Sequence, residues 1–168
     1  YLFDLNSQSI QKEFNTLVKS LKNFTSQHDD TLSPKWEICR HLEGMLIGPI
    51  LVALGMSEYF LENIKNNQSI DTQTIESKMP VFWSIMDFFQ YLGWIINTDD
   101  SFRFTPEGIF FMKRSTAYGV TVSYLPTFQK TSELLFGNPN ILWNRNPEGL
   151  ETHVNRRMNV WGSGGAHS

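Results

Sequence analysis

Apolar residues recur every three or four positions near the start of the chain, and this spacing predicts an amphipathic helix from about residue 9 to residue 26. One side of such a helix collects Ile10, Phe14, Leu17, Val18, Leu21 and Phe24. The opposite side carries Lys12, Asn15, Lys19 and Lys22, and is predicted to face solvent. The polar stretch that follows, up to residue 32, is predicted to be a linker.

A second helix is predicted to begin at Ser33 and Pro34, because a serine cap followed by a first-turn proline is typical of a helix start. Its inward positions are predicted to be Trp36, Cys39, Leu42, Met45 and Leu46. Gly48 and Pro49 are predicted to break this helix and start a short one that ends near Gly55.

The next block predicts a helix, a second helix, a short β-hairpin and a further helix. Residues 70–77 fit a short helix, and residues 81–92 a strongly apolar one that Gly93 ends. Two β-type runs, 94–96 and 102–104, flank a polar turn. This order is typical of a winged-helix domain with the hairpin as its wing. The predicted fold class is therefore mainly α, a winged-helix-like helical domain with a short β-hairpin and additional C-terminal helices.

The C-terminal third predicts a helical extension. The string YGVTVSYLP at 118–126 leads into a helix over 127–136, and a second helix is predicted over 150–160. The terminal GSGG fits either an anion-binding nest or a flexible hinge, and the hinge is favoured because the lysine of a phosphate-binding loop is missing. Three segments are therefore expected: 1–32, a helix and linker; 33–117, the winged-helix-like domain; and 118–168, the extension ending in a hinge.

Composition narrows the class of protein. Of 168 residues, 40% are hydrophobic and 14% aromatic, which argues against disorder. With Cys39 as the one cysteine, neither an internal disulfide nor a cysteine-based zinc site is expected, and the expected compartment is a reducing one, the cytoplasm. The most apolar run, 45–56, is shorter than the roughly 20 residues that span a bilayer, so no membrane partner is expected.

Charge argues against nucleic acid as a partner. The chain carries a formal net charge of −3, and between residues 69 and 104 its basic residues are Lys78 and Arg103. A helix that reads DNA needs basic or amide side chains on its outer face. The predicted wing is therefore interpreted as structural, although nucleic-acid binding and a stand-alone dimeric interaction protein stay open as alternatives.

Two sets of strings resemble a known family. The run from GPILVALGMSEYF through the hairpin to TPEG is similar to the N-terminal winged-helix domain of class I S-adenosylmethionine-dependent methyltransferases. In that family the domain dimerises and covers the active site. The strings YGVTVSYLP, LLFG and HVNRRMNVWGSGGAHS resemble more narrowly the methyltransferases of polyketide synthase loading modules.

The resemblance implies a non-catalytic dimerisation, lid or adaptor module of a methyltransferase that acts on an acyl or polyketide-type substrate. The acidic, glycine-rich turn of the family's catalytic core is missing, so the isolated chain is expected to be inactive and to hold no cofactor. S-adenosylmethionine, with a metal in some relatives, is expected in the complete protein. The implied partners are the catalytic core, which is expected to follow residue 168, an acyl carrier protein and a second copy of the chain.

Within this chain no catalytic, cofactor-binding or metal-binding residue is predicted. Six residues are candidates for contact with the acyl substrate: Tyr118, Ser123, Tyr124, His153, Arg156 and His167.

Each candidate has a structural alternative. The tyrosines are more typical of core positions with a solvated hydroxyl. His153, Arg156 and Arg157 are predicted to share a helix face, which is either solvated and paired with Glu148 and Glu151 or anion-binding, with Arg156 as the clamp. His167 is a metal ligand or proton donor of the complete enzyme, or idle here.

Overall fold

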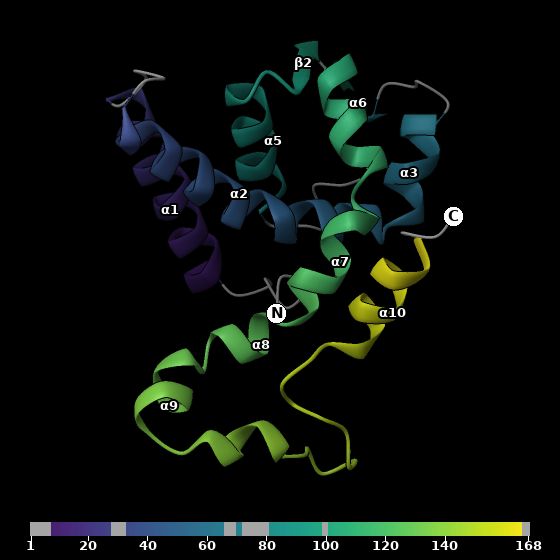
Figure 1. The fold of residues 1–168 in the computed structure, drawn as a ribbon. Coiled ribbons are helices and arrows are strands. Elements are labelled where there is room, and N and C mark those ends of the chain that lie inside the picture. Colours follow the sequence, from purple (N-terminus) through teal and green to yellow (C-terminus); the bar gives the residue numbers. More distant parts are fainter. Residues whose placement is uncertain (1–7, 28–32, 66–69, 72–80, 99–100, 166–168) are drawn as a thin grey trace. The chain divides into compact units, whose positions relative to one another are not determined.

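The computed structural model describes residues 8–27, 33–65, 70–71, 81–98 and 101–165 (Figure 1). The chain separates into two compact units, residues 1–113 and 114–168. The elements of the first unit are α1 (Gln8–Ser26), α2 (Pro34–Gly55), α3 (Glu58–Lys65), β1 (Ile70–Asp71), α5 (Phe82–Tyr91), β2 (Ile95–Thr98), β3 (Ser101–Phe104) and α6 (Pro106–Lys113).

Helix α1 confirms the predicted amphipathic helix, with Phe14, Val18 and Leu21 buried. Helix α2 begins as predicted, since the Ser33 hydroxyl accepts a hydrogen bond from the Lys35 N–H. The predicted break at Gly48 and Pro49 is wrong, because α2 continues through both residues. An internal proline removes one backbone hydrogen bond, and the burial of the apolar residues that follow, up to Gly55, compensates for this loss.

The three short strands form an antiparallel sheet in the order β1-β3-β2. Strand β2 pairs with β3 from Ile95 opposite Phe104 to Thr98 opposite Ser101, which confirms the predicted hairpin. The helix predicted over 70–77 is wrong at its start, where Ile70 pairs with Phe102 as a strand; residues 72–77 lie outside the described part. Pairing with a distant strand outweighs a weak local helix preference.

Aromatic side chains make up much of the core of the first unit. Phe82, Phe88 and Phe89 of α5 are fully buried, as is Phe102 of β3. Phe89 packs against Trp94 with ring centroids 5.3 Å apart, and Trp94 stacks on Phe111 of α6 at 4.4 Å. The strongly apolar helix predicted over 81–92 is confirmed.

The second unit contains α7 (Thr116–Ser123), α8 (Leu125–Phe128), α9 (Thr131–Phe136), the 3-10 helix η2 (Pro139–Trp143) and α10 (Arg156–Gly165). The 118–126 segment is itself largely helical, and the helix predicted over 127–136 is divided. The helix predicted over 150–160 begins only at Arg156, because the Asn155 side chain caps it by accepting from the Met158 N–H at 3.1 Å.

The predicted glycine-rich hinge is wrong for its described residues. Gly162 to Gly165 form the last turn of α10, which lies beside α7 (Figure 1). A Cβ atom placed on Gly162 would lie 2.6 Å from the Val120 nitrogen, and one on Gly119 would lie 2.6 Å from the Gly162 Cα. The glycines therefore let two helix backbones touch, which sequence periodicity does not reveal.

The observed elements confirm the fold class predicted from the sequence, mainly α with a short hairpin and additional C-terminal helices. Within the described residues one helix, α2, is long and apolar enough to cross a membrane, and more than half of its apolar stretch is buried inside the fold. Such burial is typical of a core helix.

Candidate functional site

Helix α1 lies along the outer, polar side of α5. The Ser84 hydroxyl donates to the Asn15 side-chain oxygen, and the Thr25 and Tyr91 hydroxyls share a hydrogen bond. Between these contacts the Lys22 ammonium group donates to the Asp87 carboxylate at 2.5 Å and to the Asp87 carbonyl oxygen at 3.1 Å. Three polar side chains of α5 are therefore engaged by another helix of the same unit.

Helix α5 precedes the hairpin, the position that a DNA-reading helix takes in a winged-helix domain. Its ten residues include no lysine or arginine. Across the described residues from Val81 to Phe104, the single basic side chain is Arg103. This surface therefore lacks the clustered cations that bind phosphates.

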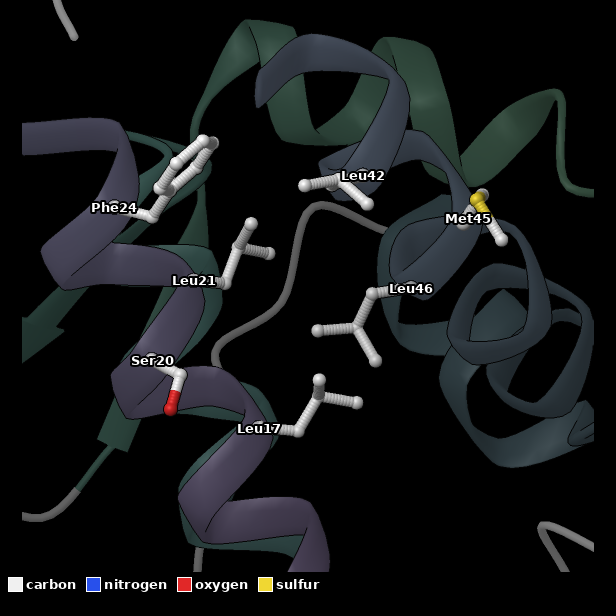
Figure 2. Close-up of a pocket in the computed structure, with 7 residues that line it drawn as sticks. All are labelled: Leu17, Ser20, Leu21, Phe24, Leu42, Met45 and Leu46. Carbon is white, nitrogen blue, oxygen red and sulfur yellow. The ribbon is translucent and has the colours of Figure 1, made fainter. Parts of the chain in front are cut away.

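An apolar groove of about 530 Å³ lies between α1 and α2 (Figure 2). Among the described residues its lining is apolar except for one hydroxyl, and these residues are Leu17, Ser20, Leu21, Phe24, Leu42, Met45 and Leu46. Leu17 and Leu21 point from α1 toward Leu42 and Leu46 of α2 (Figure 2). Leu42 and Met45 were predicted to be inward, but they are 41% and 74% exposed.

The groove is continuous with a more polar depression on α1. This second hollow, of about 540 Å³, shares Leu17 and Ser20 with the groove, and the other described residues beside it are Lys12, Glu13 and Thr16. The Thr16 hydroxyl donates to the Lys12 carbonyl oxygen at 2.8 Å. One end of the α1 surface is therefore apolar, and the other presents an ammonium group, a carboxylate and hydroxyl groups.

Helix α2 also buries an acid. The Glu43 carboxylate forms an ion pair with Arg40, in which Glu43 Oε2 lies 2.6 Å from Arg40 Nη1. The other carboxylate oxygen, Oε1, has no hydrogen-bond partner among the described residues. Burial raises the pKa of Glu43, and the Arg40 charge offsets part of that rise.

In the second unit, the candidate Ser123 is fully buried between α7 and the start of α10. Its hydroxyl donates to the Val120 carbonyl at 2.5 Å and accepts from the Asn159 amide at 3.0 Å. Its carbonyl oxygen accepts from the Asn155 N–H at 2.8 Å. Ser123 therefore joins two helices, and these contacts fit a structural role.

His153 lies before α10 rather than on it, so the predicted helix face shared with Arg156 and Arg157 is wrong. The Thr127 hydroxyl holds the His153 carbonyl at 2.6 Å, while the buried Nδ1 atom has no hydrogen-bond partner in the described part of the chain. Tyr124 is 38% exposed, and Tyr118 is half-buried.

Arg156 is paired with Glu151, the first of its two alternatives, and donates to the two carboxylate oxygens at 2.7 and 2.8 Å. This hydrogen bonding lowers the pKa of Glu151 and raises that of Arg156. The guanidinium group is therefore occupied by a carboxylate of the same unit.

His167 lies outside the described residues, and those residues contain no group of three or more His, Cys, Asp or Glu side chains that would hold a metal.

Helices α9 and η2 bury none of their residues. The large apolar side chains exposed by more than half between residues 128 and 150 are Phe128, Leu135, Phe136, Trp143 and Leu150. We call these five the apolar arm. Several large apolar side chains exposed within one short segment are a candidate surface for protein contacts.

Sequence reasoning singled out neither the groove nor the apolar arm. The groove positions fall on the apolar stripes of two helices, so periodicity assigns them to the core. The signal that was present is the width of the α1 stripe, in which Leu17 and Phe24 flank the residues that become buried.

Two comparisons with known proteins bear on the family. Residues 43–138 match the family model of the AprA winged helix domain, a span that covers α2 from its midpoint, the three-stranded sheet and the helices up to α9. No curated protein matches the chain.

Proposed function

The chain belongs to the family of AprA winged helix domains, and from this premise we propose that it is the non-catalytic N-terminal module of an S-adenosylmethionine-dependent methyltransferase that acts on an acyl or polyketide-type substrate. The proposal rests on the resemblance of the YGVTVSYLP and HVNRRMNVWGSGGAHS strings to such enzymes. It places the cofactor in a separate catalytic core of the parent protein, in a cytoplasmic setting.

The observation that carries the proposal is the contact of α1 with α5. The polar side chains of Ser84, Asp87 and Tyr91 bind α1, and this use of α5 within its own unit supports a role in packing. A winged helix closed in this way serves as a scaffold for protein contacts. This favours the interaction module over the nucleic-acid-binding alternative.

The apolar arm supports a docking role. Its five side chains are between 53% and 88% exposed, and at about 150–250 Å² for an aromatic side chain they present roughly 700 Å² of apolar surface. This approaches the roughly 800 Å² that each partner contributes to a standard protein interface. The arm therefore has the area to dock on the catalytic core; an acyl carrier protein and a second copy are further proposed partners.

Two measurements on the isolated chain test the proposal. Calorimetric titration with S-adenosylmethionine is expected to give no binding heat, and tight binding would contradict the assignment of the cofactor to another domain. A gel shift with mixed duplex DNA at low salt is expected to show no complex. A stable complex that disappears on Arg103→Glu would favour the nucleic-acid alternative instead.

A docking variant tests the arm itself. Phe136→Ser with Trp143→Ser removes its two most exposed aromatic side chains and is expected to lower the affinity of the chain for the catalytic core of its parent protein. The matched control is Ile96→Ser, an exposed apolar residue of the other unit. Equal affinities for the two variants would contradict the docking role.

A further inference from the structure

We infer that the groove between α1 and α2 is a binding site for the aliphatic chain of a medium-length acyl compound, with its polar head at the Lys12 end. The inference does not require that the parent protein is a methyltransferase. It rests on the volume of the groove, its lining and the polar depression that continues it.

The groove has the size and chemistry of a small-molecule site. Such sites are concave, between roughly 300 and 1,000 Å³, and mostly apolar with a few polar groups. The groove measures about 530 Å³, and the Ser20 hydroxyl is the polar group in its lining. A methylene group needs about as much space as the roughly 30 Å³ of a liquid water molecule. The 530 Å³ of the groove therefore corresponds to about 17 such groups, and a chain of about ten carbons fits with room to spare.

A protein partner fits the groove less well than a small ligand. The exposed apolar side chains of its lining are Leu17, Phe24, Leu42 and Met45, at 54%, 36%, 41% and 74% exposure. Together they present at most about half of the roughly 800 Å² that one side of a standard protein interface contributes. The groove is thus hollow enough for an acyl chain but too small for a stable protein contact.

The adjoining depression sets the direction of the ligand. Lys12, Glu13 and Thr16 line it, and Leu17 and Ser20 belong to both hollows. An acyl chain lying along Leu17, Leu21 and Leu46 therefore reaches the polar hollow with its carbonyl end. The Lys12 ammonium group attracts an anionic head, and the Glu13 carboxylate opposes it.

Binding of sodium decanoate to the whole chain, measured by calorimetry, tests the site. The expected Kd is about 10–100 μM, and each pair of methylene groups removed from the ligand is expected to weaken binding by about tenfold. Absence of binding at about 1 mM, or a Kd that does not change from decanoate to octanoate and hexanoate, would overturn the inference.

Variants locate the site. Leu17→Gln and Leu42→Gln place an amide at two partly exposed positions of the groove and are expected to weaken decanoate binding about tenfold each. The control Ile96→Gln changes a residue that is 51% exposed and lies on β2, and it is expected to have no effect. Circular dichroism confirms that each variant is folded, and equal affinities for all three would refute the assignment.

Charge variants test the direction of the ligand. Lys12→Gln is expected to weaken the binding of decanoate, and Glu13→Gln to strengthen it, whereas neither changes the binding of uncharged decanol. If both ligands respond equally, the proposed head position is wrong.

Analytical ultracentrifugation tests whether a second copy of the chain occupies the groove instead. A dimer that dissociates in Leu17→Gln and Leu42→Gln, but not in Ile96→Gln, would assign the groove to a second copy and overturn the inference.

Discussion

Two glycines of α10 differ sharply in their surroundings, and this difference predicts opposite effects of the same substitution. A Cβ atom on Gly162 would lie 2.6 Å from the Val120 nitrogen and 2.7 Å from the Gly119 Cα, whereas a Cβ atom on Gly164 meets nothing within 4 Å. The atoms that Gly162→Ala would meet belong to the backbone of α7, so they cannot rotate away. The substitution must push the two helices apart.

The magnitudes follow from two opposing effects. Replacing glycine by alanine within a helix favours folding by up to about 1 kcal/mol, and overpacking a tight contact costs about 1–3 kcal/mol. Gly162→Ala is therefore expected to lower the free energy of unfolding of the second unit by about 1–2 kcal/mol. Gly164→Ala, near the helix end, is expected to raise it by about 0.5 kcal/mol.

Urea denaturation measures this difference, with hydrogen exchange of the α10 amides to follow the second unit by itself. At an m-value of about 2 kcal/mol/M, Gly162→Ala is expected to lower the urea midpoint by about 0.5–1 M, and Gly164→Ala to raise it slightly. A midpoint for Gly162→Ala equal to that of Gly164→Ala would refute the close contact between α7 and α10.

Three further substitutions test the first unit. Burial raises the pKa of Glu43 in the folded state, so the protonated side chain contributes stability below the unfolded pKa, and this stability is lost as the pH rises through the folded pKa. Glu43→Gln is therefore expected to raise the urea midpoint more at pH 7 than at pH 4. An equal change at the two pH values would contradict the raised pKa. Tyr91→Phe removes the hydroxyl that bonds Thr25 and is expected to cost about 0.5–1.5 kcal/mol in the same assay, whereas Tyr124→Phe, at an exposed position, is expected to cost nothing measurable. Gly108→Ala would place a Cβ atom 2.2 Å from the Trp94 carbonyl oxygen and is expected to destabilise the first unit by about 3 kcal/mol. Tryptophan fluorescence would then show thermal unfolding at a lower temperature. An unchanged unfolding temperature would contradict the close contact between Gly108 and Trp94.

Local sequence signals predicted much of the first unit. The apolar spacing of residues 10–24 predicts α1, the serine and proline at 33 and 34 predict the start of α2, and the polar turn between two β-type runs predicts the hairpin. Each of these signals acts between residues that are close in the chain. Errors arose where a distant contact decides, as at Ile70, which pairs with Phe102.

The candidate site was harder to predict, because a periodic stripe shows that a residue is apolar but not what covers it. Leu42 and Met45 have the spacing of core positions, and α1 does not reach them. In the second unit, the candidate serine and histidine are used in contacts between the α7–α8 segment and the start of α10. Charge suggested that Arg156 is either paired with the nearby acids Glu148 and Glu151 or binds an anion, and the structure shows the pair with Glu151.

The sequence by itself determined the helical class, the hairpin, the buried Cys39 and the scarcity of basic side chains around α5, because periodicity, turn residues and charge are properties of neighbouring positions. Only the tertiary structure decided that α1 engages the polar side of α5, that an apolar groove stays open between α1 and α2, and that the terminal glycines are helical. These three features join segments up to 69 residues apart, as Asn15 and Ser84 are. Such contacts depend on how whole faces of helices fit together, which no local pattern records.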